Sequence, residues 1–120
     1  MTAFVPDVPL RVLATVAGAR SLRIGIEGVL DFRTADTLVT AVCAHLEDHP
    51  DTDDLELVCT RMGMCDSAGL SALLMIRRRT AAAGARLRLT DRSPRLDRLL
   101  DLTGTLHHLT GESAEPAPRT

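Results

Sequence analysis

The sequence predicts an α/β fold: a mixed central sheet of about five strands, with helices packed against it and a β-hairpin at its start. Along the 120 residues, segments in which apolar and polar side chains alternate, as in strands, are interspersed with segments of helical periodicity. The first two alternating segments follow one another across a turn, which favours a hairpin. The later strands are separated by helices, which favours parallel pairing.

The first half of the chain contains the predicted hairpin and one helix. Residues 10–16 and 22–27 alternate on either side of a Gly-containing turn. Gly28–Asp31 ends the second strand, and Thr34 is a suitable N-cap for a helix that reaches about Asp48. A polar loop then leads to a short apolar strand at residues 55–60, fit for the interior of a sheet.

The second half repeats the alternation of helix and strand. A helix is expected from about Ser67 to Ala83, followed by a strand at 85–90 and a helix that Ser93-Pro94 opens and Gly104 ends. A last short strand is expected at 106–109. One side of the long helix is apolar, although Arg77 falls within it; the apolar residues are Leu70, Leu73, Leu74, Ile76 and Ala81.

Composition excludes several classes of protein. The net charge is −2 and the only aromatic residues are Phe4 and Phe32, so direct nucleic-acid binding is not expected. No segment resembles a membrane span or a signal peptide. Three cysteines without a CxxC pair suggest reduced thiols in a cytoplasmic protein, and no His/Cys spacing indicates a metal site. No cofactor is expected.

The most informative segment is Met64–Leu70, where a serine follows a carboxylate at the start of the long helix. Ser67 could cap the helix or accept a phosphate, because a helix N-terminus tolerates negative charge. From the pattern alone, capping is the favoured role. A G-x-S-x-G elbow and a P-loop are both missing, so neither a serine hydrolase nor a P-loop nucleotidase is expected, and the protein is not expected to be an enzyme.

Several motifs together resemble the STAS-domain anti-sigma factor antagonists of bacteria. Asp66–Leu70 is similar to the family's signature, Gly28–Asp31 to its turn after the second strand, and Ser93–Gly104 to its closing helix. The resemblance covers about residues 8–110 and implies a STAS fold. It leaves residues 1–7 as an N-terminal extension and 111–120 as a disordered tail.

The resemblance implies a function based on partner switching. The unphosphorylated antagonist would bind an anti-sigma factor that is also a serine kinase, and so release a sigma factor. Phosphorylation of Ser67 would block this binding, and a phosphatase would restore it. Asp31 and Asp66 match the acidic residues beside the acceptor, and Ala68 leaves Ser67 as the one acceptor in the signature. The alternative is a non-switching STAS interaction module or a transporter-associated STAS subunit.

The long helix also offers a candidate face for the partner. Ser67, Ser71 and Arg78 recur at helical spacing, with Met75 beside them, in a stripe next to the apolar side. We expect both aspartates to be exposed at strand ends and to assist phosphorylation more than they stabilise the fold. The residues expected to contact the partner are Ala68, Gly69, Ser71, Met75 and Arg78.

Overall fold

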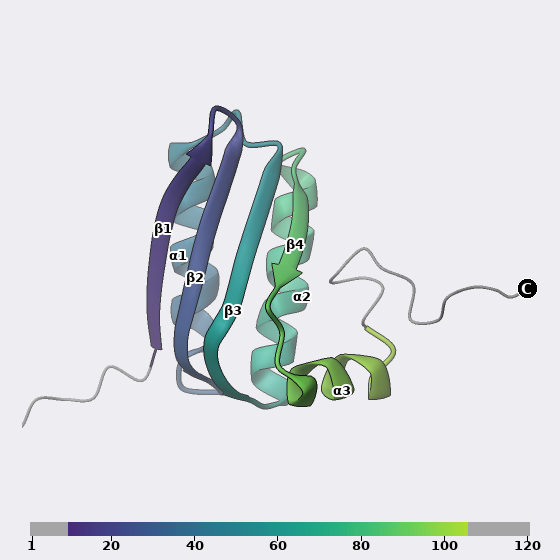
Figure 1. Cartoon of the computed structure of the whole chain (residues 1–120). Coiled ribbons are helices and arrows are strands. Elements are labelled where there is room, and N and C mark those ends of the chain that lie inside the picture. The colour runs from purple at the N-terminus through teal and green to yellow at the C-terminus, as the bar shows by residue number, and fades with distance from the viewer. Residues whose placement is uncertain (1–9, 106–120) are drawn as a thin grey trace, which may run out of the picture.

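The computed structural model describes residues 10–105, which form one mixed sheet with three helices (Figure 1). The expected strand at 106–109, the N-terminal extension at 1–7 and the tail at 111–120 lie outside these residues. The elements in chain order are β1 (Leu10–Gly18), β2 (Ser21–Leu30), α1 (Ala35–Asp48), β3 (Asp54–Cys65), α2 (Ser67–Ala82), β4 (Arg86–Thr90) and α3 (Pro94–Leu102).

The four described strands lie in the order β1-β2-β3-β4. The β1–β2 hairpin is antiparallel, and both β2–β3 and β3–β4 are parallel, as the sequence predicts for strands joined by helices. In the central register Ile24 lies beside Leu57, and Leu57 beside Leu89. This arrangement confirms the predicted α/β class with an initial hairpin.

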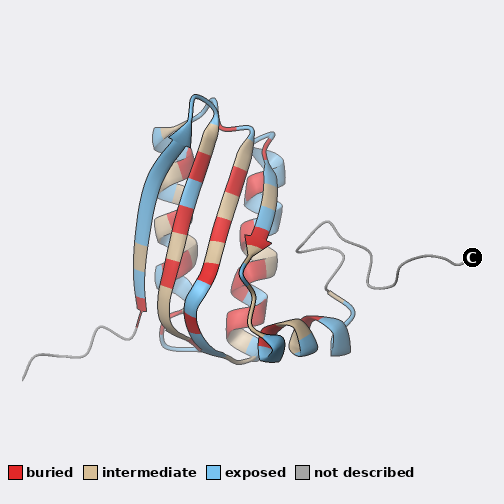
Figure 2. Cartoon of the chain, in the orientation of Figure 1, coloured by how far each residue is buried: buried red, intermediate tan, exposed pale blue. Residues whose placement is uncertain are grey.

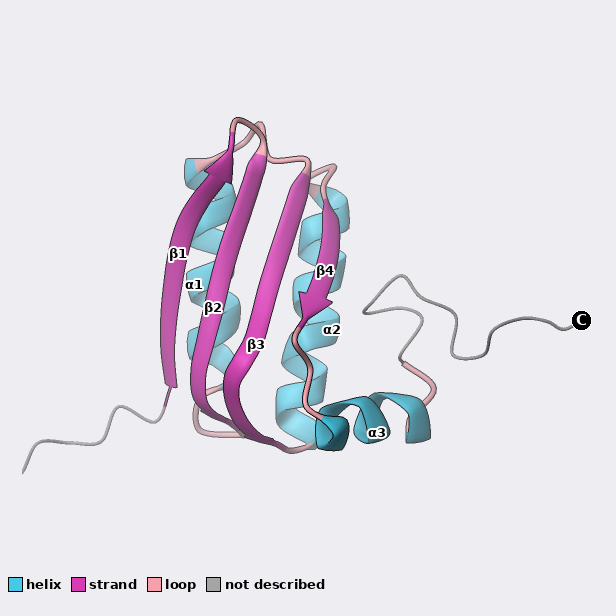
Figure 3. Ribbon diagram, in the orientation of Figure 1, coloured by secondary structure: helices cyan, strands magenta, loops and turns pink. Residues whose placement is uncertain are grey.

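Helices α1 and α2 cover one face of the sheet, and α3 lies at the end of the sheet where β3 runs into α2 (Figure 3). The core fills the space between the sheet and these two helices. Its central side chains are fully buried on the two middle strands (Figure 2). The largest come from β2, β3, β4 and all three helices: Ile24, Ile26, Leu30, Leu38, Leu55, Leu57, Leu73, Ile76, Leu89 and Leu100.

Two details of the predicted elements are corrected. Strand β3 runs from Asp54 to Cys65, well past the expected end at Thr60, because it continues beside β2 as far as Leu30. On α2, Thr80 is buried and Ala81 is exposed. The Thr80 hydroxyl donates a 2.6 Å hydrogen bond to the Ile76 carbonyl, which lets a polar side chain occupy the core side of the helix. Arg77 is exposed.

Candidate functional site

The candidate site forms where the ends of β2 and β3 meet. Leu30 pairs with Cys65, and the backbone N–H of Asp66 donates to the Leu30 carbonyl at 3.2 Å. The turn after β2 and the start of α2 therefore lie against each other. Parallel strands joined by helices expose their carboxyl ends at one edge, which is where such folds usually place functional residues.

Asp66 joins these two segments. Its Oδ1 accepts a hydrogen bond from the Gly69 N–H at 2.9 Å, and its Oδ2 accepts one from the Phe32 N–H at 3.2 Å. Asp66 is therefore the N-cap of α2, and Ser67 is the first helical residue. The capping role that the pattern favoured for Ser67 is wrong, because the residue before it makes the capping bond.

Ser67 is exposed at the helix start. Within residues 10–105 its hydroxyl makes no hydrogen bond, since Asp66 already satisfies the first turn. The free backbone N–H groups of a helix N-terminus and their partial positive charge surround this position. The geometry thus leaves a hydroxyl in solvent at a place where added negative charge is tolerated.

Asp31 is buried, contrary to the expectation of an exposed carboxylate. Its Oδ2 accepts hydrogen bonds from Nε and Nη2 of Arg33 at 3.2 and 3.0 Å, and its Oδ1 accepts one from the Arg33 N–H at 2.9 Å. The Arg33 guanidinium, followed in effect by backbone donors and opposed by burial, lowers the pKa of Asp31. Asp31 therefore remains ionised and orders the turn.

Gly69 is also buried and does not lie on the exposed stripe. A Cβ atom at this position would approach the Leu30 carbonyl oxygen to 2.5 Å and the Cys65 sulfur to 2.9 Å. The signature glycine thus lets α2 pack closely on the ends of β2 and β3. Its place among the expected partner contacts is not supported by its position, because it faces the sheet.

A groove of about 540 Å³ runs from the site along the boundary between α1 and α2. It contains three of the expected contact residues, Ala68, Ser71 and Met75, whereas Arg78 is exposed on α2 outside the groove. The complete lining is Phe32, Ala35, Asp36, Val39, Ala68, Ser71, Ala72, Met75 and Arg79.

Phe32 is the site residue that sequence reasoning missed. Its side chain is 75% exposed, although it is one of only two aromatic residues in the chain. The Asp31 and Asp66 bonds hold its backbone on either side. The sequence did hold a signal: Phe32 directly follows Asp31 in a predicted turn, where an aromatic side chain has few core neighbours to pack against.

Cys65 directly precedes Asp66 but is not a candidate nucleophile. Burial, with the Asp66 charge as the second cause, raises the pKa of its thiol to about 11. A thiol with this pKa stays neutral near pH 7, and only the thiolate is strongly nucleophilic. In residues 10–105 no cluster of three or more His, Cys, Asp or Glu side chains has a metal-binding arrangement.

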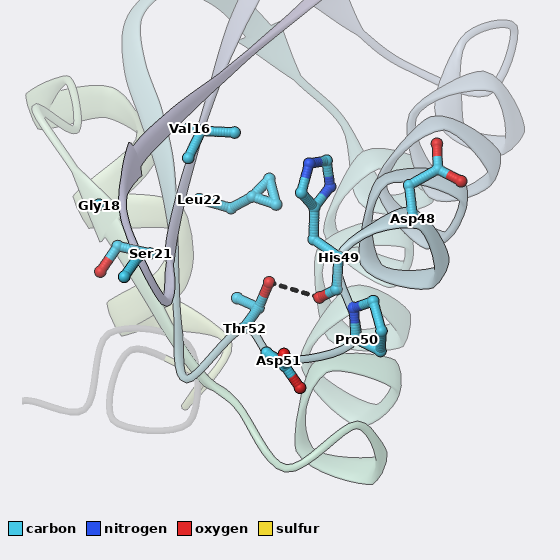
Figure 4. Close-up of a pocket in the computed structure, with 10 residues that line it drawn as sticks. Val16, Gly18, Ser21, Leu22, Asp48, His49, Pro50, Asp51 and Thr52 are labelled. Atoms are coloured by element: carbon cyan, nitrogen blue, oxygen red, sulfur yellow. Dashed lines mark hydrogen bonds between the residues drawn. The ribbon is translucent and has the colours of Figure 1, made fainter.

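A second cavity, of about 220 Å³, lies at the opposite end of the sheet (Figure 4). The β1–β2 turn, the end of α1 and the loop before β3 form it. Thr52 Oγ1 donates to the His49 carbonyl at 2.7 Å, and this bond fixes the loop. None of the predicted site residues line this cavity, so we assign it no part in the candidate site.

Comparisons with known proteins bear on the fold of the chain. The family model described as "Mlab, STAS domain" matches residues 13–111. No curated protein matches the sequence. No helix of the described chain is both long and apolar enough to cross a membrane.

Three solved structures share the fold. The unphosphorylated anti-sigma factor antagonist SpoIIAA has a TM-score of 0.69 and 16% identity over 83% of this chain and 86% of its own. An anti-sigma factor antagonist from Mycobacterium paratuberculosis has a TM-score of 0.67 and 20% identity over 83% of this chain and 82% of its own. A sulfate transporter family protein from Wolinella succinogenes has a TM-score of 0.67 and 24% identity over 81% of this chain and 76% of its own.

Proposed function

Because the chain belongs to the STAS-domain family, we propose that it is an anti-sigma factor antagonist controlled by phosphorylation of Ser67. The unphosphorylated form binds a cognate anti-sigma factor that is also a serine kinase, and so frees a sigma factor. Phosphorylation ends this binding and a phosphatase restores it. The protein acts in the cytoplasm by binding and catalyses no reaction itself.

The observation that carries the proposal is the separation of roles between Asp66 and Ser67. Asp66 caps α2, and the exposed Ser67 hydroxyl is free to react without loss of a hydrogen bond from residues 10–105. A kinase needs such an accessible acceptor. If the acceptor also capped the helix, each phosphorylation would remove the capping hydrogen bond and lower the stability of the domain.

The switch follows from charge. A phosphate on Ser67 would add about −1.5 to −2 charges beside the Asp66 carboxylate. The helix N-terminus would accept that charge, so the domain would stay folded. A partner surface fitted to a neutral hydroxyl would instead meet added bulk and like charge, at a desolvation cost. Arg33 pairs with Asp31 and offsets its charge, whereas Asp66 directly precedes the phosphorylated residue in the chain.

The partner surface proposed here combines the serine with the groove beside it. Ala68, Ser71 and Met75 line the groove, and Phe32 stands at its Ser67 end. An exposed aromatic residue next to a soft methionine is the kind of centre that carries binding energy in protein interfaces. Arg78 would contribute at the margin of this surface.

The test uses a serine kinase of the anti-sigma factor class from the same genome, which the proposal requires. Incubation with this kinase and ATP, followed by mass spectrometry, should place one phosphate on Ser67. Ser67→Ala should abolish incorporation, and Thr40→Ala, which removes an exposed hydroxyl on α1 outside the groove, should leave it intact. Phosphate found elsewhere while Ser67 stays unmodified would refute the assignment.

The second candidate is a STAS module that binds a transporter component without switching. The solved structure of a sulfate transporter family protein, which shares the fold, favours it. Affinity purification of the wild-type protein and of Ser67→Glu separates the two functions. An antagonist should lose its anti-sigma factor on this change, whereas a non-switching module should retain its transporter partner.

A further inference from the structure

The two edges of the described sheet differ in how they are protected. At one edge, β4 is five residues long and exposes two arginines, Arg86 and Arg88. Short edge strands with charged side chains resist pairing with other strands. At the other edge, β1 is nine residues long, contains no proline, and carries one charge, on Arg11. Within residues 10–105 the β1 edge therefore lacks the usual protection.

Strand β1 also exposes apolar side chains. Leu13 is 43% exposed and Val16 is 59% exposed, and every residue from Leu13 to Gly18 is exposed. No other element of residues 10–105 lies beyond β1 (Figure 1). Alternate N–H and C=O groups of an outer strand point away from its neighbour, so they are available to another strand.

We propose that the β1 edge is the homodimer interface of this protein, formed by antiparallel pairing of β1 with β1 of a second copy. A twofold axis makes an antiparallel edge self-complementary, because the same residues serve on both sides. Pairing centred on Leu13 sets Leu13 opposite Leu13, Val12 opposite Ala14, and Arg11 opposite Thr15. The two four-stranded sheets then become one continuous sheet.

Charge favours this register. Arg11 meets a neutral threonine, and the two Arg11 side chains are offset by four residues, about 13 Å along the strands. That separation exceeds the Debye length of about 8–10 Å at ordinary ionic strength, so their repulsion is largely screened. The two leucines at the centre form an apolar cross-strand pair.

The flank of α1 leaves room for the second copy. Val39 and Cys43 line the clefts between α1 and α2. At 3.6 residues per turn, the flank away from α2 therefore carries Thr37, Ala41, Ala44 and Asp48. The first three side chains are small, and Asp48 lies at the end of α1 beside Val16 and Gly18, away from the Leu13 axis about which the two copies pair. Ser67 follows β3, two strands away from this edge, and remains accessible.

The experiment measures the mass of the full chain by sedimentation velocity over a wide range of concentration. The wild type should show a monomer–dimer equilibrium. Leu13→Arg places like charges opposite each other and should raise the dimer dissociation constant about tenfold or more. Leu102→Arg, the same change at a leucine that is 78% exposed on α3, should leave dimerisation unchanged.

A charge-swap experiment tests the register. Leu13→Arg and Leu13→Asp should each be monomeric alone and should form a heterodimer when mixed. A wild type that stays monomeric at every concentration, a dimer insensitive to Leu13→Arg, or a mixture that fails to associate would each overturn the proposal. Amide exchange that shows β1 protected in a monomer would also overturn it, since a terminal segment would then cover the edge. The result does not depend on whether Ser67 is phosphorylated.

Discussion

At the scale of single residues, Asp66 is the side chain that joins the two segments of the site. One carboxylate oxygen holds the first turn of α2 and the other holds the Phe32 backbone. The sequence pattern indicated an acidic residue beside a helix start, but two polar residues in succession could each have been the cap. Backbone geometry decides between them, since the extended conformation needed at an N-cap occurs at Asp66.

Substitution of Asp66 should separate its structural contribution from its effect on phosphorylation. Asp66→Asn keeps an oxygen that can accept from Gly69 but loses the acceptor for the Phe32 N–H, so it should lower the melting temperature less than Asp66→Ala, which should cost about 0.5–2 kcal/mol as a lost cap. We expect both to slow phosphorylation of Ser67. Denaturant titration and initial phosphorylation rates measure the two effects. An unchanged rate in Asp66→Asn would mean that the charge has no part in the transfer.

Gly69→Ala should destabilise the domain although it adds only one methyl group. The new Cβ would meet the Leu30 carbonyl and the Cys65 sulfur below contact distance, so α2 must shift. The expected loss is about 1–3 kcal/mol of unfolding free energy, as for other overpacked sites. Gly63→Ala is the control, because its nearest neighbour lies at 3.5 Å. Equal stability of the two variants would contradict this account.

At the scale of elements, α2 serves both the core and the exposed groove. The side toward the sheet is buried through Leu70, Leu73 and Ile76, as the periodicity predicted. Thr80 was missed because a hydroxyl scores as polar, and its bond to the preceding turn appears only once the helix exists. The groove could not be predicted, since it depends on how α1 and α2 lie side by side.

Met75→Glu should weaken binding of the anti-sigma factor without unfolding the domain. Met75 is half-buried in the groove, and a carboxylate there would need desolvation on partner binding. The expected loss of binding free energy is about 1–2 kcal/mol, measured by calorimetry. Ser71→Arg should act in the same direction through bulk. Arg78→Ala should have a smaller effect, because Arg78 lies outside the groove.

At the scale of the whole molecule, the sheet is covered by α1 and α2 on one face, and polar ladders cross the other. Glu56 on β3 accepts hydrogen bonds from Arg23 on β2 at 3.0 Å and from Thr90 on β4 at 2.6 Å. These contacts link three strands. The α/β class and the order of elements followed from alternation of patterns, but these cross-strand partners depend on a register that the sequence leaves open.

Stability should fall in acid because three carboxylates gain partners on folding. The Arg33 guanidinium lowers the pKa of Asp31, Arg20 lowers that of Asp53, and the Thr90 hydroxyl and Arg23 lower that of Glu56. A carboxylate with a lowered folded pKa stabilises the fold above its unfolded pKa. This contribution is lost as the pH falls below the unfolded pKa of about 4 and then through the lower pKa of the folded state.

Thermal unfolding at a series of pH values tests this. The melting temperature of the wild type should drop steeply below about pH 4. The Asp31→Asn variant should have a lower melting temperature than the wild type at pH 7. Its melting temperature should fall by less than that of the wild type on acidification. Asp101→Asn, at an exposed aspartate of α3, should follow the wild-type curve. Parallel curves for all three proteins would show that Asp31 is not a source of the acid sensitivity.

The exposed hydroxyl of Ser67 has an evolutionary consequence. No hydrogen bond within residues 10–105 uses it, so a single codon change at position 67 could remove or mimic the proposed phosphate while the cap, the groove and the β1 edge stay intact. Regulation and scaffold are therefore genetically separable in this chain. A duplicated copy could become a permanently active or permanently silent competitor by one mutation, and descendants with the same architecture would differ in whether they respond to a kinase at all.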